Sequence, residues 1–388
     1  MLSSDGPFPL TSISPEAMSK QKGYGLGIEA AMPRMNAPLL PYRPRETRRY
    51  RPKIAVIGCG GIAGWHLRAY LDAGYHVAAL CDIVRESAEK RRCEFFPEAS
   101  VHADYREILD RPDIDLVDIA LHPAARLPAM EAAIRAGKHV LSQKPFVLDL
   151  DEGARLAALA ETQGVKLAVN QNGRWAPHFS YMREAVQRGL LGEVMGAHLS
   201  VHWNHDWLAG TAFDAVRHAL LYDFAIHWFD IARLFLSPKE VTTVSATVAM
   251  APGQRSKPPL LGQAMMGFEG GQASLSFDAF TKFGPQDRTY VVGTKGSITS
   301  FGPDLSRQKV TLFTERGYGS PRLRGSWFPA GFHGAMAELL RAIEDNVEPS
   351  HGARDNLKSL AICFAAVASA EEGRPIVPGS VRRMPEFA

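Results

Sequence analysis

The sequence predicts an α/β protein in two parts: an N-terminal domain with a parallel sheet, and a C-terminal α+β domain with a large open-faced antiparallel sheet. Between residues 53 and 170, apolar runs alternate with helical stretches, which is typical of a parallel sheet with helices on both faces. Between residues 241 and 314, strand-like runs follow one another without helices, which is typical of an antiparallel sheet. A chain of 388 residues, 46% of them hydrophobic, is also longer than one core usually serves.

Residues 1–50 are expected to form an extended N-terminal arm. Prolines recur throughout this segment, which has neither a helical nor a strand period, and its end is rich in arginine. A solvated linker is one interpretation. The other is an arm that wraps a neighbouring subunit or lies along the phosphates of a cofactor. We expect the parallel-sheet domain at residues 51–172, followed by a domain for substrate binding and oligomerisation at residues 173–388.

The stretch 53–82 predicts the first strand, turn, helix and second strand of the parallel domain. An apolar run at 54–57 is typical of a strand that is buried on both faces. Glycines at positions 58, 60, 61 and 64 then form a turn, and an amphipathic helical stretch follows it. A second apolar strand at 77–80 leads into Asp82.

This order of strand, glycine turn, helix, strand and acid predicts a dinucleotide-binding Rossmann fold. Glycines let the backbone approach a pyrophosphate closely, and the N-terminus of the next helix offers free N–H groups. Asp82 lies where a carboxylate accepts hydrogen bonds from the adenosine ribose and repels a 2′-phosphate, which favours NAD over NADP. A Rossmann fold that has lost its ligand is the alternative. The contacts expected here are Gly58, Gly60, Gly61, Ile62, Ala63 and Asp82.

The remaining elements follow from the period of the apolar residues. In the first domain we expect helices at 85–95, 104–110, 127–136 and 150–163, and strands at 115–120, 139–141 and 166–169. In the second domain we expect helices at 177–188, 216–235, 332–345 and 355–371. Its strands are expected at 197–203, 241–250, 264–268, 273–280, 289–292, 296–301 and 309–314, with a hairpin turn at 269–272.

Bulk properties exclude several classes of partner. A net charge of +3 gives no field that would favour nucleic acid or a membrane surface. No apolar run approaches the length needed to cross a bilayer. The four cysteines lack metal-site spacing, so reduced thiols in a cytoplasmic protein without a bound metal are expected.

Lys144 is the first candidate for chemistry. It follows the strand predicted at 139–141, at the sheet edge where open α/β folds bind ligands. Pro145 restricts its backbone to an extended conformation. A lysine at this edge could reach a substrate hydroxyl or the nicotinamide ribose, whereas an ordinary Lys-Pro sequence lies in a surface loop.

Asp223 and His227 are the second candidate. Four residues apart in the predicted helix, they share one face, while an apolar stripe lies on another. Histidine is the usual residue for moving a proton near neutral pH, and a neighbouring carboxylate can orient it. A polar pair that caps or pins the helix is the alternative.

A run of histidines forms the third candidate. In a strand, His198, His202 and Asn204 point to one face, and Trp203 points to the other. A polar and aromatic wall suits a polyhydroxylated ligand, although purely structural roles fit as well. The spacing matches no familiar zinc site.

Taken together, these residues resemble the glucose–fructose oxidoreductase/inositol dehydrogenase (Gfo/Idh/MocA) family over about residues 53–375. The ordered motifs that carry the resemblance are IGCGGIA at 57–63, CD at 81–82, AGKHVLSQKP at 136–145, NGRWAP at 172–177, GLLGEV at 189–194, DFAIHWFD at 223–230 and GTKGS at 293–297. Three positions depart from the family pattern. Gln143 replaces the usual Glu before Lys-Pro, Leu121-His122-Pro123 with Arg126 replaces Thr-Pro-Asn with a His, and Ala225 replaces a frequent Gly.

The resemblance implies a cleft between the two domains in which a hydroxyl group reacts beside the nicotinamide. It implies Lys144, Asp223 and His227 as the catalytic set. Further cofactor contacts are then expected from Leu121, His122, Lys144 and Asn172. Substrate contacts are expected from Lys144, Arg174, His202, Asn204, Asp223 and His227.

The favoured hypothesis is an NAD(H)-dependent oxidoreductase acting on a sugar, a sugar derivative or a cyclitol. His227 would take the hydroxyl proton, Lys144 would stabilise the developing alkoxide, and Asp223 would orient His227 or a second hydroxyl. Two alternatives remain open: a glycoside hydrolase that uses NAD for a transient oxidation and elimination, and a non-catalytic, ligand-sensing homologue. Because the sequence offers no second layer over the antiparallel sheet, a homodimer or homotetramer through that sheet is expected.

Overall fold

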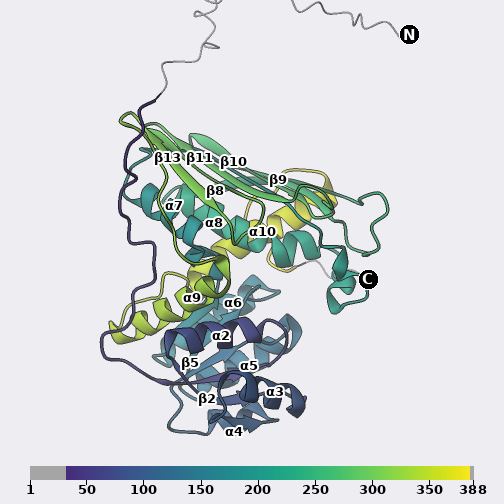
Figure 1. Cartoon of the computed structure of the whole chain (residues 1–388). Helices are drawn as coiled ribbons and strands as arrows, with labels where there is room; N and C mark the ends of the chain where they lie inside the picture. The colour runs from purple at the N-terminus through teal and green to yellow at the C-terminus, as the bar shows by residue number, and fades with distance from the viewer. Residues whose placement is uncertain (1–31, 385–388) are drawn as a thin grey trace, which may run out of the picture.

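The computed structural model describes residues 32–384, so the expectation for the first part of the arm lies outside the described residues. The N-terminal domain is built on a six-stranded parallel sheet in the order β3-β2-β1-β4-β5-β6 (Figure 1). This is the expected Rossmann arrangement, in which the strand order reverses between β1 and β4. Its strands are β1 (Lys53–Ile57), β2 (His76–Cys81), β3 (Ser100–His102), β4 (Leu116–Ile119), β5 (His139–Gln143) and β6 (Leu167–Asn170). Its helices are α2 (Ala63–Ala73), α3 (Arg85–Phe95), α4 (Tyr105–Leu109), α5 (Pro123–Arg135) and α6 (Leu150–Thr162).

The C-terminal domain holds an eight-stranded sheet in the order β14-β13-β12-β11-β7-β10-β9-β8. All its neighbouring strands are antiparallel except β7 and β10, which run parallel. The expected hairpin joins β9 to β10, with Gly270 at φ +75° in the turn. The strands are β7 (Val194–His202), β8 (Val241–Ala249), β9 (Leu261–Phe268), β10 (Gly271–Asp278), β11 (Gln286–Gly293), β12 (Gly296–Gly302), β13 (Lys309–Thr314) and β14 (Gly317–Gly319).

In the part of the chain that the structure describes, helices cover one face of this sheet and leave the other without helices (Figure 1). Side chains such as Leu199, Leu275 and Ile298 are buried on that face, as the alternation of a half-covered strand requires. On the opposite face, Met265 is 57% exposed and Phe301 is 51% exposed. The helices of this domain are α7 (Pro177–Gln187), α8 (Ile226–Leu236), α9 (Trp327–Glu344) and α10 (Ala353–Glu372), with shorter turns η2 (Asn172–Trp175), η3 (Asp206–Leu208), η4 (Ala212–Ala215) and η5 (Leu220–Phe224).

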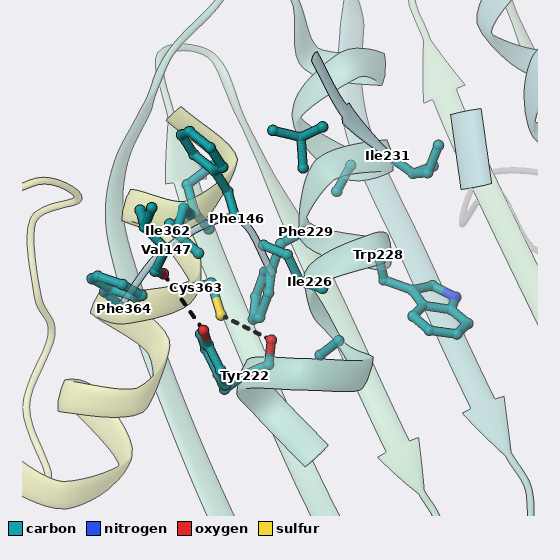
Figure 2. Packing of buried hydrophobic residues seen from close by; sticks show 14 of the residues in the cluster. Phe146, Val147, Tyr222, Ile226, Trp228, Phe229, Ile231, Ile362, Cys363 and Phe364 are labelled. Carbon is teal, nitrogen blue, oxygen red and sulfur yellow. Dashed lines mark hydrogen bonds between the residues drawn. The ribbon is translucent and has the colours of Figure 1, made fainter. Parts of the chain in front are cut away.

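The two sheets are joined by buried packing. Helix α9 comes late in the chain, yet its Phe332 and Met336 pack in one apolar cluster with Ile54 of β1 and Leu67 of α2. On the other side, Tyr222 of η5 packs beside Cys363 of α10, as Figure 2 shows. Its hydroxyl donates a hydrogen bond to the carbonyl of Val147 at 3.5 Å. Both contacts therefore help to anchor the C-terminal domain to the N-terminal one.

The described part of the arm lies along its own chain and spans both domains (Figure 1). At one end, the Met35 N–H donates to the Tyr318 carbonyl of β14 at 2.8 Å. At the other end, the Glu344 carboxylate at the end of α9 accepts hydrogen bonds from the backbone N–H groups of Arg48, Arg49 and Tyr50 at 2.9, 2.6 and 2.9 Å. Residues 32–52 thus fasten the sheet edge and α9 together.

The prediction of one long helix at 216–235 is wrong for the first half of that segment. The segment instead contains the π-helical turn η5, in which the Ala225 N–H donates to the Leu220 carbonyl at 2.8 Å, and α8 begins only at Ile226. The Sγ of Cys363 lies 3.2 Å from the Leu221 carbonyl, so α10 supplies a donor to a carbonyl of this turn. Apolar spacing alone does not distinguish a π turn from an α-helical one, and such turns are frequent at functional sites.

Two short strands were not expected from the sequence. Strand β3 lies at one edge of the six-stranded sheet, and strand β14 lies at one edge of the eight-stranded sheet. Each has only three residues. Three residues are too few to show an alternating pattern, so only pairing with a neighbour defines them. Among residues 32–384, no helix combines the length and the apolar character needed to cross a membrane.

Candidate active site

Lys144 and Asp223 form an ion pair where the two domains meet. Lys144 directly follows β5, and its Nζ lies 3.0 Å from Asp223 Oδ2 and 2.8 Å from the Asp223 carbonyl oxygen. The two side chains are 15% and 12% exposed, so the pair is largely shielded but still reaches solvent. The ring of Phe224 lies 5.8 Å from the same ammonium group. The structure therefore brings the first and second candidates of the sequence together.

His227 lies one residue into α8 and is 9% exposed. Burial, and then the positive charge of Lys144, hold the pKa of His227 well below its usual range. The imidazole is therefore neutral near pH 7 and able to accept a proton. Its Nδ1 is buried without a hydrogen-bond partner in the described part of the chain.

The expected contact between Asp223 and His227 is not formed. Within residues 32–384 no hydrogen bond links the two side chains, and the Asp223 carboxylate binds Lys144 instead. Asp223 lies in the π turn, whereas His227 lies in α8. The two residues are therefore not on one continuous α-helix, and the expectation that they share one helix face does not apply. In this structure Asp223 orients the lysine rather than the imidazole.

Trp327 closes the other side of His227, and nothing in the sequence pattern had singled it out. Its ring lies 5.3 Å from the His227 ring, and its Nε1 donates to Asn172 Oδ1 at 2.6 Å. Gly173 lies beside both rings, and a glycine is needed there because an added Cβ would come within 2.9 Å of the Trp327 ring. Trp327 is some 100 residues from the histidine in sequence, so only a tertiary contact reveals it.

The glycine turn leaves room for a pyrophosphate. Gly58 has φ +97°, and a Cβ there would lie 2.8 Å from the Ala120 carbonyl oxygen. At Gly60 and Gly61, in contrast, an added Cβ would meet no heavy atom within 4 Å. Helix α2 begins after Ile62 without a side-chain cap. Its first N–H groups are therefore available to an anion, as a dinucleotide requires.

Asp82 holds the same turn from the end of β2. Its Oδ2 accepts a hydrogen bond from the Cys59 N–H at 2.8 Å, and its Oδ1 accepts one from the Val84 N–H at 2.9 Å. The carboxylate thus lies next to the glycine turn, where an adenosine ribose would bind in a Rossmann fold. The residues present fit a bound dinucleotide.

A cavity of about 720 Å³ opens beside Asp223 between the domains. His122, the residue before α5, contributes to its wall from the N-terminal domain, and Tyr222 contributes from η5. The volume falls in the range typical of small-molecule sites. Other lining residues are Pro123, Leu148, Asp149, Phe213, Ala215, Val216, Arg217, His218, Arg383 and Met384.

Three of the expected substrate contacts lie elsewhere. His202 points to the outer face of the sheet, where its Nδ1 lies 2.7 Å from Asp278 Oδ2. Asn204 is exposed, and its Oδ1 accepts the Asp206 N–H at 3.1 Å. Arg174 is 1% exposed. The structure does not bring these side chains to Lys144 and His227.

Arg174 has a structural environment instead. Its guanidinium donates to both oxygens of Asp230 at 2.7 and 2.6 Å, and to Asp355 at 2.6 Å. This ion-pair network ties η2, α8 and α10 together. A guanidinium buried between two carboxylates is inconsistent with a substrate contact, and its burial could not be read from its position beside Asn172 in the sequence.

Comparison with known proteins identifies the family. A family model described as "Oxidoreductase family, NAD-binding Rossmann fold" matches residues 52–171, and one described as "GFO/IDH/MocA C-terminal domain" matches residues 179–299. The chain belongs to the GFO/IDH/MocA oxidoreductase family. It is therefore an enzyme of the NAD-binding oxidoreductase class, as the motifs predicted.

Individual relatives cover most of the chain. The D-apiose dehydrogenase of Paraburkholderia graminis is 26% identical over 353 residues, covering 84% of this chain and 89% of that protein. The inositol 2-dehydrogenase of Rhizobium meliloti is 27% identical over 338 residues, covering 84% of this chain and 98% of that protein. The fold is also that of an oxidoreductase from Agrobacterium radiobacter, solved in complex with NAD⁺, L-tartaric acid and magnesium. That match has a TM-score of 0.77 at 23% identity and covers 85% of this chain and 99% of that one.

Arg126 is a departure from the family pattern whose surroundings the structure explains. Although it is 1% exposed, the guanidinium donates its hydrogen bonds, among residues 32–384, to carbonyl oxygens at the ends of two neighbouring strands. It donates to the Leu121 carbonyl at 2.7 Å, to the Gln143 carbonyl at 2.6 Å, and to the Pro145 carbonyl. Arg126 thus links the loop after β4, expected to contact the cofactor, to the loop that carries Lys144.

Proposed function

We propose that this protein transfers hydride between NAD and a hydroxyl-bearing carbon of a sugar, a sugar derivative or a cyclitol. The observation that carries the proposal is the Lys144–Asp223 ion pair, 3.0 Å long, next to a neutral, buried His227. The family and the relatives named as apiose and inositol dehydrogenases support a substrate of this kind. NAD, when bound, supplies the hydride acceptor.

Each residue of the set has a separate task in this proposal. Lys144 Nζ donates a hydrogen bond to the reacting hydroxyl and stabilises the negative charge that develops on its oxygen. His227 accepts the hydroxyl proton as the carbon-bound hydrogen leaves with its electron pair. Asp223 holds the ammonium group in place, and its carboxylate can also accept a hydrogen bond from a second hydroxyl.

The cofactor lies, in the same proposal, along the C-terminal edge of the parallel sheet. Gly60, Gly61 and the first turn of α2 hold the pyrophosphate, and Asp82 accepts the ribose hydroxyls. Asn172, fixed by its hydrogen bond from Trp327, lies at the nicotinamide end. The remaining proposed contacts are Gly58, Ile62, Ala63, Leu121, His122 and Lys144.

The test is a thermal-shift screen of the NAD-loaded protein against sugars, sugar acids, cyclitols and glycosides. Compounds that raise the melting temperature are then assayed for NADH formation. The proposal expects a polyol or sugar to be oxidised with net NADH, and expects His227→Asn to abolish this turnover while NAD still binds. Glycoside cleavage without net NADH would instead establish the hydrolase chemistry, and near-native turnover by His227→Asn would refute the role of the histidine.

We also propose that copies of the chain associate through the outer face of the eight-stranded sheet, as a homodimer or homotetramer. The exposed Met265 and Phe301 on that face support this assignment. A cytoplasmic location is proposed as well, because Cys59, Cys81, Cys93 and Cys363 are all unpaired thiols.

A further inference from the structure

A buried hydrogen-bond network lies beneath the loop that carries Lys144. His66 on α2 and Asp118 on β4 are both 0% exposed. The His66 Nδ1 lies 2.6 Å from Asp118 Oδ2, and the Tyr70 hydroxyl donates to the same oxygen at 2.6 Å. A carboxylate so far from solvent needs such donors, because an unpaired buried charge is strongly unfavourable.

The other side of the imidazole faces Gln143. The His66 Nε2 lies 3.3 Å from the side-chain nitrogen of Gln143 and 3.3 Å from that of Asn170. The side-chain oxygen of Gln143 accepts the backbone N–H of Lys144 at 2.8 Å. An unbroken series of contacts therefore runs from Asp118 through His66 and Gln143 to the backbone of the proposed catalytic lysine.

These contacts determine which nitrogen of His66 carries the proton. The amide orientation of Gln143 is fixed, because its oxygen is the acceptor for the Lys144 N–H. Its nitrogen can only donate, so the His66 Nε2 must present a lone pair. The proton then lies on Nδ1, where it is donated to Asp118. The imidazole is neutral, and each member of the series donates to the next acceptor.

We propose that His66 is a positioning residue for Lys144, held in its neutral Nδ1–H form and acting through Gln143. The same geometry explains why glutamine is compatible with position 143, where the resemblance leads one to expect glutamate. An ionised glutamate would present a carboxylate oxygen to the lone pair of His66 Nε2, and that contact would hold only if the imidazole took up a second proton. This inference rests on the proposed role of Lys144.

The surroundings of His66 contain few groups that could titrate with it. Asp118 from β4 and Tyr70 from α2 itself are its ionisable neighbours in the network, whereas β5 and β6 present the amides. From α9 the contact is the ring of Phe332, at 4.5 Å. Burial, and then Asp118, hold the pKa of Tyr70 well above its usual value, so the phenol remains a donor.

The decisive variants are Gln143→Glu, which replaces the donor by an acceptor, and Gln143→Met, which removes both hydrogen bonds at similar length. Gln163→Glu makes the same chemical change at an exposed position after α6 and serves as the matched control. The ring nitrogens of ¹⁵N-labelled histidine report the tautomer of His66 without any turnover. The pH profile of kcat, measured with the substrate found above, reports the effect on Lys144.

In the native protein, the spectrum should show His66 with its proton on Nδ1 and a lone pair on Nε2. In Gln143→Glu the imidazole should carry both protons at low pH, and kcat should fall as the pH rises and Nε2 loses its proton. Gln143→Met should lower kcat by about tenfold at every pH, as expected when Lys144 loses the one hydrogen bond that its backbone N–H donates to Gln143, with little change in KM for NAD. Gln163→Glu should match the native protein in both measurements.

Two results would overturn the inference. One is a native His66 with its proton on Nε2, and the other is a Gln143→Glu variant whose pH profile and histidine spectrum match those of the native protein. If native protein turns over no compound of the screen, the proposed function fails, but the histidine spectra still decide the state of His66. If Gln143→Glu does not fold, the spectrum of native protein and the kinetics of Gln143→Met still show whether the inference about His66 holds.

Discussion

Replacing Arg126 by leucine should impair catalysis far more than folding. The substitution removes the hydrogen bonds that the guanidinium donates to the carbonyls of Leu121, Gln143 and Pro145. At about 1.5 kcal/mol for each bond to a charged group, this loss is about 4–5 kcal/mol. Part of this loss of stability is offset, because the variant no longer has to bury a cation at position 126.

The offset follows from the pKa of Arg126, which burial lowers to about 10. A cation whose pKa is lower in the folded state destabilises the fold at every pH below that value, so the penalty is present in full at pH 7. At about 1.4 kcal/mol per tenfold change, it amounts to about 3 kcal/mol. The net loss of stability should therefore be only about 1–2 kcal/mol, which lowers the melting temperature by a few degrees.

Activity should respond more strongly, because the same side chain joins the loop after β4 to the loop of Lys144. A displacement of about 1 Å between reacting groups costs roughly a hundredfold in rate, so kcat/KM of Arg126→Leu should fall by about that factor. The matched control is Ile134→Val, a fully buried change on the same helix with a similar cost of about 1 kcal/mol. Denaturant unfolding and NADH absorbance measure the two effects. A loss of activity no larger than that of Ile134→Val would refute the reasoning.

Three further outcomes are expected. Because burial and Lys144 lower the pKa of His227, the acidic limb of the kcat/KM profile should lie below about pH 6.5, and a limb at or above that pH would contradict the assignment. Asp82→Asn should narrow the preference for NAD over NADP, since it removes a charge that repels the 2′-phosphate; an unchanged ratio of the two kcat/KM values would contradict this. Met265→Arg combined with Phe301→Arg should reduce the mass measured by light scattering to that of a monomer, and an unchanged oligomer, or a monomeric native protein, would contradict the sheet interface.

The local pattern of the sequence was sufficient for the fold and for the centre of the candidate site. The glycine turn, the apolar strand before it and Asp82 after it form one continuous unit, so their arrangement depends little on the rest of the chain. Lys144 was placed by the same reasoning, because parallel strands end at one edge of a sheet. The family comparison confirms the fold, the cofactor class and the enzyme class that these patterns predicted.

The pairing of the candidates was decided by contacts between distant segments. The π turn before α8 leaves no mark in the apolar spacing, yet it places Asp223 on Lys144 rather than on His227. Trp327 and Arg126 gain their roles only from the segments that pack against them. A periodic pattern reports which residues of one element share a face, but it carries no information about the partner of that face.

His202 shows most clearly the difference between what the sequence determined and what the packing of the elements decided. Alternation along a strand determined that His198 and His202 share one face and that Leu199 and Val201 share the other. It did not determine which face is covered by helices, because that depends on where α8 packs. The sequence by itself therefore determined the two-domain α/β fold, the glycine turn after β1 and the positions of Lys144, Asp223 and His227 along the chain. Only the tertiary structure decided which side chains face one another, because a side chain's partner is set by packing between elements rather than by its place within one.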